Sequence, residues 1–76
     1  MKALLETLAR GLVSEPSRVR VKEWTEDGIV HLDLQVSSVD RGRVIGRKGR
    51  TADALRTLLE AVAHRRDTEC DMEVVG

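Results

Sequence analysis

The sequence contains neither phenylalanine nor tyrosine, and Trp24 is its only aromatic residue. Folds that hold single-stranded nucleic acid on stacked aromatic side chains, such as RRM, cold-shock and OB-fold domains, need several such residues. We therefore expect none of these folds. The single cysteine, Cys70, excludes a disulfide framework and a zinc site built from cysteines.

Neither sign of charge is in excess, since thirteen Lys and Arg residues balance thirteen Asp and Glu residues. Net charge therefore indicates no class of partner. Residues 1–6 reach a carboxylate after three apolar residues, which predicts neither a signal peptide nor a membrane span. From these features and the lone cysteine we expect a cytoplasmic protein with one domain, residues 1–76.

The hydrophobic pattern predicts six secondary-structure elements. Apolar residues recur at helical spacing in three segments and at alternate positions in three others. The predicted helices cover residues 2–13, 39–45 and 50–62, and the last of them fades around residues 64–66. The predicted strands cover residues 17–24, 29–36 and 68–74. Asp27-Gly28 is a hairpin signal, so the first two strands should be antiparallel. The last strand follows two helices and should lie parallel to the second strand through a right-handed crossover.

The expected fold is therefore α+β, with the order α-β-β-α-α-β. Three helices should cover one face of a small, three-stranded mixed sheet. The last strand alternates strictly, which points Cys70, Met72 and Val74 inward and a row of carboxylates outward. Outward charges of this kind protect a sheet edge from unwanted pairing.

Trp24 falls on the outward face of the first strand, in register with Arg20 and Lys22. The favoured interpretation is an aromatic ring that lies against neighbouring cationic side chains. The alternative is a contact patch for a partner protein, or a stacking site for one base.

Charge is balanced over the whole chain but not locally. The window 41–50 contains five cations and no acid, whereas the window 67–76 contains four acids and no base. The five cations are Arg41, Arg43, Arg47, Lys48 and Arg50. They surround two glycines placed three residues apart between two predicted helices, which favours a binding site over an ordinary solvated helix end.

The segment Gly46-Arg47-Lys48-Gly49 predicts a tight turn before the helix at residues 50–62, because glycine permits positive φ. The start of a helix favours an anion. We expect backbone amides near Gly49 and Arg50 to meet a phosphate, with the two long cations alongside. Val44 and Ile45 precede the turn and could supply an apolar groove floor, as an oligonucleotide requires.

No catalytic, metal or cofactor site is predicted. The glycine spacing matches neither a P-loop nor the G-x-G-x-x-G dinucleotide motif. His31 and His64 do not stand at metal-ligand spacing from Cys70. Because no nucleophile–base pair or carboxylate dyad can be assembled, we expect a protein that is not an enzyme.

Residues 44–51, Val-Ile-Gly-Arg-Lys-Gly-Arg-Thr, resemble the V-I-G-x-x-G core of a KH domain. The predicted order of elements resembles the type II, prokaryotic form of that fold. The chain as a whole looks like the small single-KH RNA-binding proteins of bacteria. It departs from the pattern at Ala52, where many KH domains carry a large aliphatic residue, and this predicts a shallower groove.

The resemblance implies a groove for about four unpaired nucleotides, clamped by the glycine loop. The implied contacts are Gly46, Arg47, Lys48 and Gly49 at the sugar-phosphate backbone, with Val44 and Ile45 under or beside the bases. Charge and position add Arg50 and Arg43 to this set.

The resemblance also implies a partner, which is either a second copy of the chain or a larger KH-containing RNA-binding protein. The first hypothesis is a non-catalytic single-stranded RNA-binding protein, acting with that partner as an RNA chaperone or post-transcriptional regulator. The alternative is a protein–protein adaptor that dimerises through a KH fold and has little affinity for RNA.

Overall fold

The structure is a computed structural model that describes residues 1–76. Its helices are α1 (Lys2–Leu12), α2 (Ser38–Ile45) and α3 (Arg50–Arg65), and its strands are β1 (Arg20–Glu26), β2 (Ile29–Gln35) and β3 (Glu69–Val75). Short 3₁₀ turns at Pro16–Arg18 and Arg47–Gly49 precede β1 and α3. The predicted order of helices and strands is confirmed.

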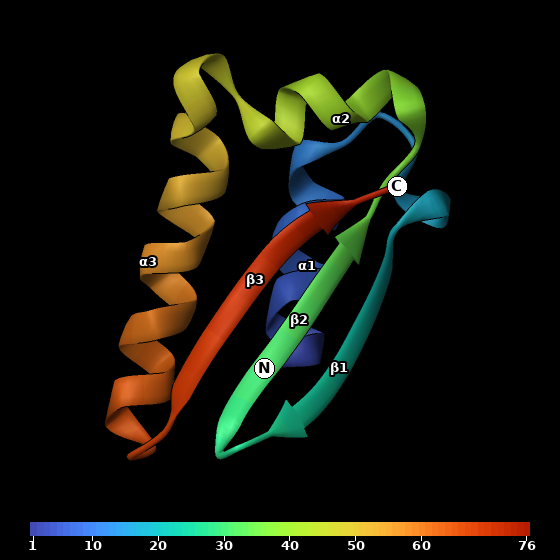
Figure 1. Ribbon diagram of the computed structural model, residues 1–76. Coiled ribbons are helices and arrows are strands. Elements are labelled where there is room, and N and C mark those ends of the chain that lie inside the picture. Colours follow the sequence, from blue (N-terminus) through green and yellow to red (C-terminus); the bar gives the residue numbers. More distant parts are fainter.

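The three strands form one mixed sheet in the order β1-β2-β3. The first pair is antiparallel and the second is parallel, as predicted. In Figure 1, α1 lies behind the sheet, α3 runs beside β3, and α2 crosses the end at which β2 and β3 finish. The helices therefore enclose one face of the sheet and leave the other uncovered.

The core lies between α1, α3 and the covered face of the sheet. It contains eleven buried apolar residues: Leu5, Ala9, Val19, Val21, Leu32, Leu34, Val36, Val44, Leu55, Leu59 and Met72. Cys70 and Val74 pack against this cluster, so the predicted inward face of β3 is confirmed. Burial of this apolar surface is the main favourable contribution to folding.

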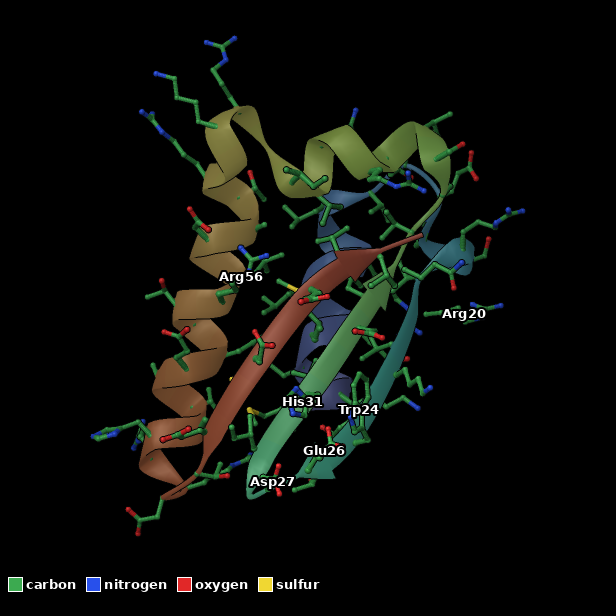
Figure 2. All side chains as sticks on the ribbon, viewed as in Figure 1. Arg20, Trp24, Glu26, Asp27, His31 and Arg56 are labelled. Carbon is green, nitrogen blue, oxygen red and sulfur yellow. The ribbon has the colours of Figure 1, made fainter.

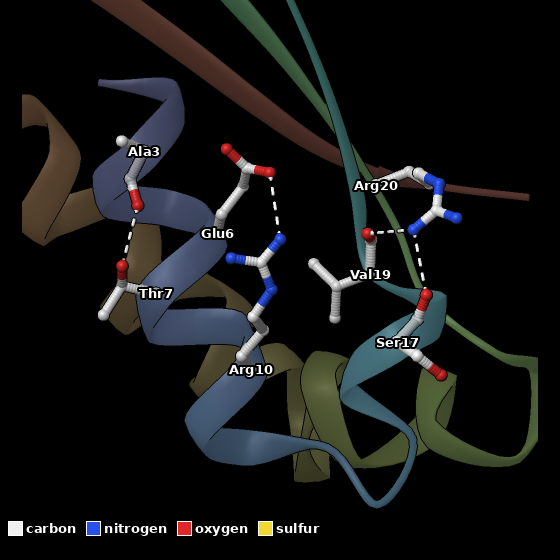
Figure 3. Close-up of polar contacts among 7 residues, drawn as sticks. All are labelled: Ala3, Glu6, Thr7, Arg10, Ser17, Val19 and Arg20. Atoms are coloured by element: carbon white, nitrogen blue, oxygen red, sulfur yellow. Dashed lines mark hydrogen bonds and ion pairs between the residues drawn. The ribbon is translucent and has the colours of Figure 1, made fainter.

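The first strand begins later than predicted, at Arg20 instead of Ser17. Pro16 starts a 3₁₀ turn, in which the Val19 amide donates to the Pro16 carbonyl at 3.2 Å. The Arg20 guanidinium closes the turn by donating to the carbonyls of Ser17 and Val19, both at 2.9 Å (Figure 3). These contacts hold the segment in a turn, and extended pairing starts only after it.

The hairpin is tighter than predicted, because β1 continues to Glu26. Only Asp27 and Gly28 form the turn, and both have positive φ, 54° and 77°. Two-residue turns of this kind match the twist of paired strands.

The third helix ends at Arg65, within the segment 64–66 that the sequence predicts for its end. Ala63 is buried in this last turn, and its carbonyl accepts from the amides of Arg66 and Thr68, both at 2.9 Å.

Asp40, in the first turn of α2, joins three parts of the fold. It is buried, and its carboxylate accepts from the Ser14 amide and hydroxyl, the Glu15 amide and the Ser37 hydroxyl, at 2.9–3.1 Å. The bond from the Ser14 amide is the main cause that lowers the pKa of Asp40 to about 2. The charged carboxylate thereby ties the α1–β1 connection to the helix that leads into the glycine loop.

None of the three helices has the length and apolarity that crossing a membrane requires.

Candidate nucleic-acid interface

The glycine loop joins α2 to α3 in a conformation that requires its first glycine. Gly46 has a φ of 79°, and a Cβ there would lie 2.3 Å from the Thr51 hydroxyl oxygen. Lys48 and Gly49 have φ values of 57° and 73°, in the left-handed region. The chain therefore reverses sharply and brings the start of α3 close to the end of α2.

Four cations around this loop are free of partners. The side chains of Arg43, Arg47, Lys48 and Arg50 are exposed, and they take part in none of the ion pairs or side-chain hydrogen bonds of the structure. Arg41 differs, because it is half-buried and donates to the Gly76 carbonyl. The loop thus presents uncompensated positive charge to solvent.

The expected role of two backbone amides needs correction. The Gly49 amide donates to the Gly46 carbonyl at 3.0 Å, and the Arg50 amide donates to the Arg47 carbonyl. The loop closes as a 3₁₀ turn, so both amides already have acceptors within it. The side-chain donors of Arg47 and Lys48, in contrast, have no acceptor in the structure.

A groove of about 350 Å³ opens beside the loop, between α3 and β3. It is lined by Ile45, Gly49, Ala52, Arg56, Glu73 and Val74. Ile45 is 37 % exposed and borders the groove as expected, whereas Val44 is fully buried in the core. The Val44 side chain therefore points inward and supports α2, and its predicted place under or beside the bases stays a prediction.

Arg56 is a groove residue that the sequence analysis missed. Its Nε donates to the Met72 carbonyl and its Nη1 to Asp53, both at 2.9 Å, and it bridges α3 and β3 in Figure 2. It stands one helical turn after Ala52, so helical spacing from the glycine loop could have found it. Glu73 on β3 adds a carboxylate to the same groove.

The other chemically active side chains form no reactive cluster. Burial is the main cause that raises the pKa of the Cys70 thiol, followed by the charges of Glu60 and Asp71. A thiol in this state is a poor nucleophile, in agreement with its predicted role as a packing residue. No group of His, Cys, Asp and Glu side chains is arranged to hold a metal ion.

Trp24 lies on the uncovered face of the sheet, as predicted. Lys22 Nζ stands 5.4 Å from the centre of its ring, which confirms the favoured interpretation. The His31 ring stacks on it with centroids 5.3 Å apart.

The comparison with known families agrees with the loop, the groove and the order of elements. The KH-domain model described as "KhpA/KhpB, KH domain" matches residues 2–74. The chain belongs to this family. The resemblance to small bacterial single-KH proteins is thereby confirmed, and the α+β architecture agrees with a type II KH fold.

Relatives in the KhpA/KhpB family align with nearly the whole chain. The RNA-binding protein KhpA of Clostridium acetobutylicum is 41% identical over 75 residues, which cover 99% of this chain and 100% of the relative. The protein of the same name from Treponema pallidum is 44% identical over 72 residues, 95% of this chain and 90% of the relative. That of Halalkalibacterium halodurans is 39% identical over 75 residues, 99% of each chain.

Proposed function

We propose that the protein binds single-stranded RNA in the groove between the glycine loop and β3, without catalysing a reaction and without a cofactor. One observation carries the proposal: Arg47 and Lys48 project without partners from a loop that opens onto a partly apolar groove. Phosphates require cations and bases require an apolar surface, and the two lie side by side here. The names of the aligned relatives support RNA as the ligand.

In this proposal the residues of the loop have different contacts with the RNA. Arg47 and Lys48 contact phosphates, while Gly46 and Gly49 keep the backbone close enough for the sugar-phosphate chain. Arg50 and Arg43 extend the positive surface on either side. Ile45 contacts the bases of about four nucleotides, the number that a KH groove accommodates, and Ala52 lines the floor of the groove.

The decisive experiment reverses the charge of the loop. Arg47→Asp with Lys48→Asp should weaken binding of a short single-stranded RNA pool at least tenfold in fluorescence anisotropy, because two phosphate contacts become repulsive. Arg65→Asp with Arg66→Asp is the matched control, since it makes the same charge change at the far end of α3. We expect the RNA affinity of this control to stay within about threefold of that of the native chain.

If both variants lose RNA affinity equally, the overall charge of the protein determines binding and the loop has no special role. If the loop variant keeps its RNA affinity, the loop is not the binding site. Melting temperatures should change little in both, because all four side chains are exposed.

We further propose that the chain acts as a homodimer, in which each copy is a single KH domain. One short groove with few phosphate contacts binds weakly, and linking two sites raises the effective concentration of the second. An apolar hollow of about 220 Å³ between α1 and α3 supports this proposal. Its lining includes Leu8, Leu12 and Leu58, and Leu58 is 46 % exposed. Pairing with a larger KH protein through the same surface is the alternative.

Leu58→Asp tests the dimer, because a charge in the hollow opposes its burial against a second copy. Light scattering should show a dimer for the native chain and a monomer for the variant, with weaker RNA binding by the variant. A native chain that stays monomeric at high micromolar concentration would contradict the homodimer. Loss of the dimer with unchanged, weak RNA affinity in both proteins would instead favour the adaptor function.

Together these properties define our proposal of a cytoplasmic RNA chaperone or post-transcriptional regulator that works with a partner.

A further inference from the structure

The uncovered face of the sheet is acidic. Five carboxylates alternate outward along the three strands: Glu26, Asp33, Glu69, Asp71 and Glu73. None of them pairs with Lys or Arg. The only ionic contact that any of them makes is that of Asp71 with His31, at 3.9 Å. The outward cations of the sheet, Arg20 and Lys22, lie on β1. This face therefore attracts positive charge.

Trp24 lies on the edge strand β1 of the same face and is labelled in Figure 2. The strand register places Trp24, His31 and Asp71 in one row across the sheet. A hollow of about 390 Å³ adjoins this row and is also lined by Asp33 and Glu73. Trp24 is 36 % exposed beside its contacts with His31 and Lys22, so a cation that enters the hollow meets the exposed part of an aromatic side chain and carboxylates together.

The carboxylates of β3 have a regular spacing. Glu69, Asp71 and Glu73 occupy alternate positions, which puts successive side chains about 6.6 Å apart along the strand. An extended peptide with a cation at every second residue repeats at the same distance. A nucleic-acid strand would bring phosphates against the same carboxylates and be repelled.

We propose that this face docks an extended basic segment of a partner protein, with arginine or lysine at alternate positions. One cation of the segment lies against Trp24 and Asp71, and its neighbours meet the carboxylates before and after Asp71 on β3. The site lies away from the loop cations Arg47 and Lys48, and it shares only Glu73 with the groove beside the glycine loop.

The probe for this site is a blocked hexapeptide of alternating arginine and serine, and Trp24 emission reports its binding because no other tryptophan is present. The same peptide with citrulline for arginine is the neutral control. We expect a saturable change in Trp24 emission with the arginine peptide alone. In NMR spectra, the peptide should change the backbone amide chemical shifts of β1, β2 and β3 and leave those of residues 46–50 unchanged.

Asp33→Asn with Asp71→Asn should weaken the peptide about three- to tenfold, the range for losing two exposed ion pairs. Glu73 stays unchanged in this variant, because it also lines the groove beside the glycine loop. Glu6→Gln with Glu15→Gln, on α1 and the connection after it, removes the same charge away from this face and should change affinity less than twofold.

Three results would overturn the proposal. If the citrulline peptide binds as tightly as the arginine peptide, charge does not drive the binding. If the control variant weakens peptide binding as much as Asp33→Asn with Asp71→Asn, the peptide does not bind at this face. A short single-stranded RNA that shifts Trp24 emission, when the arginine peptide does not, would assign the surface to base stacking instead.

Discussion

The two glycines of the loop have similar φ values but different surroundings. A Cβ on Gly46 would meet the Thr51 side chain and amide at 2.3–2.8 Å, whereas a Cβ on Gly49 would have no heavy atom within 4 Å. The first position therefore needs glycine for space and for conformation, and the second needs it for conformation alone.

Alanine substitutions should separate these two requirements. Gly49→Ala should cost about 1 kcal/mol, the penalty of a left-handed alanine, or roughly 4–8 °C in melting temperature for a domain of this size. Gly46→Ala should cost about 3 kcal/mol, because steric overlap with Thr51 adds to the conformational strain. Urea denaturation of both variants measures the difference. Equal losses would mean that the close approach to Thr51 does not constrain the loop.

At the scale of elements, the Asp40 carboxylate accepts three hydrogen bonds from a segment distant in sequence, more than any other side chain. Its pKa is lowered from 3.8 to about 2, first by the bond from the Ser14 amide. A carboxylate with a lowered pKa in the folded state stabilises the fold above the pKa of the unfolded chain. That stability is lost as pH falls from about 4 towards 2.

Asp40→Asn should test this linkage, because the amide keeps the size of the side chain and removes its charge. We expect the variant to be less stable than the native chain at pH 7, and the difference to shrink as pH falls from about 4 towards 2. Urea midpoints across this pH range provide the measurement. Asp67→Asn, at an exposed turn, is the control. If the difference in stability between the native chain and Asp40→Asn is the same at all pH values, the charge of Asp40 does not stabilise the fold.

Helix α3 places two adjacent leucines in opposite environments. Leu59 is fully buried in the core, whereas Leu58 is 46 % exposed beside the apolar hollow. Leu59→Ala should lower the free energy of unfolding by about 2–5 kcal/mol, because it leaves a cavity. Leu58→Ala should change it by less than about 0.5 kcal/mol in dilute solution, where no dimer forms. Denaturation at low protein concentration compares them, and similar losses would place Leu58 in the monomer core.

The whole molecule is electrically neutral but polarised. Cations without ionic partners gather at the glycine loop, and carboxylates that pair with no Lys or Arg lie on the open face of the sheet. The glycine loop can therefore bind an anionic ligand and the open face of the sheet a cationic one, although the net charge of the chain favours neither.

Salt dependence measures how many phosphates the loop holds. If two to four cations engage, the logarithm of the RNA association constant should fall with the logarithm of salt at a slope of roughly −1.5 to −3. Anisotropy titrations at several salt concentrations give the slope. The Arg65→Asp, Arg66→Asp control should keep the native slope. A slope near zero for the native chain would contradict phosphate binding by the loop.

Much of the fold follows from residues that are neighbours in the chain. Apolar spacing located all six elements, and Asp27-Gly28 indicated the hairpin. The V-I-G-x-x-G segment indicated the family. These signals are local, because helix periodicity, strand alternation and positive φ each depend on a few consecutive residues.

The sequence by itself thus determined the order of the elements, their inward faces and the position of the glycine loop. Only the tertiary structure decided that Val44 is buried while Ile45 borders the groove, and that Arg56 bridges α3 and β3. It also decided the role of Asp40, whose main partner Ser14 lies 26 residues away. Burial and hydrogen-bond partners depend on which distant segments pack together, and no pattern of consecutive residues specifies that packing.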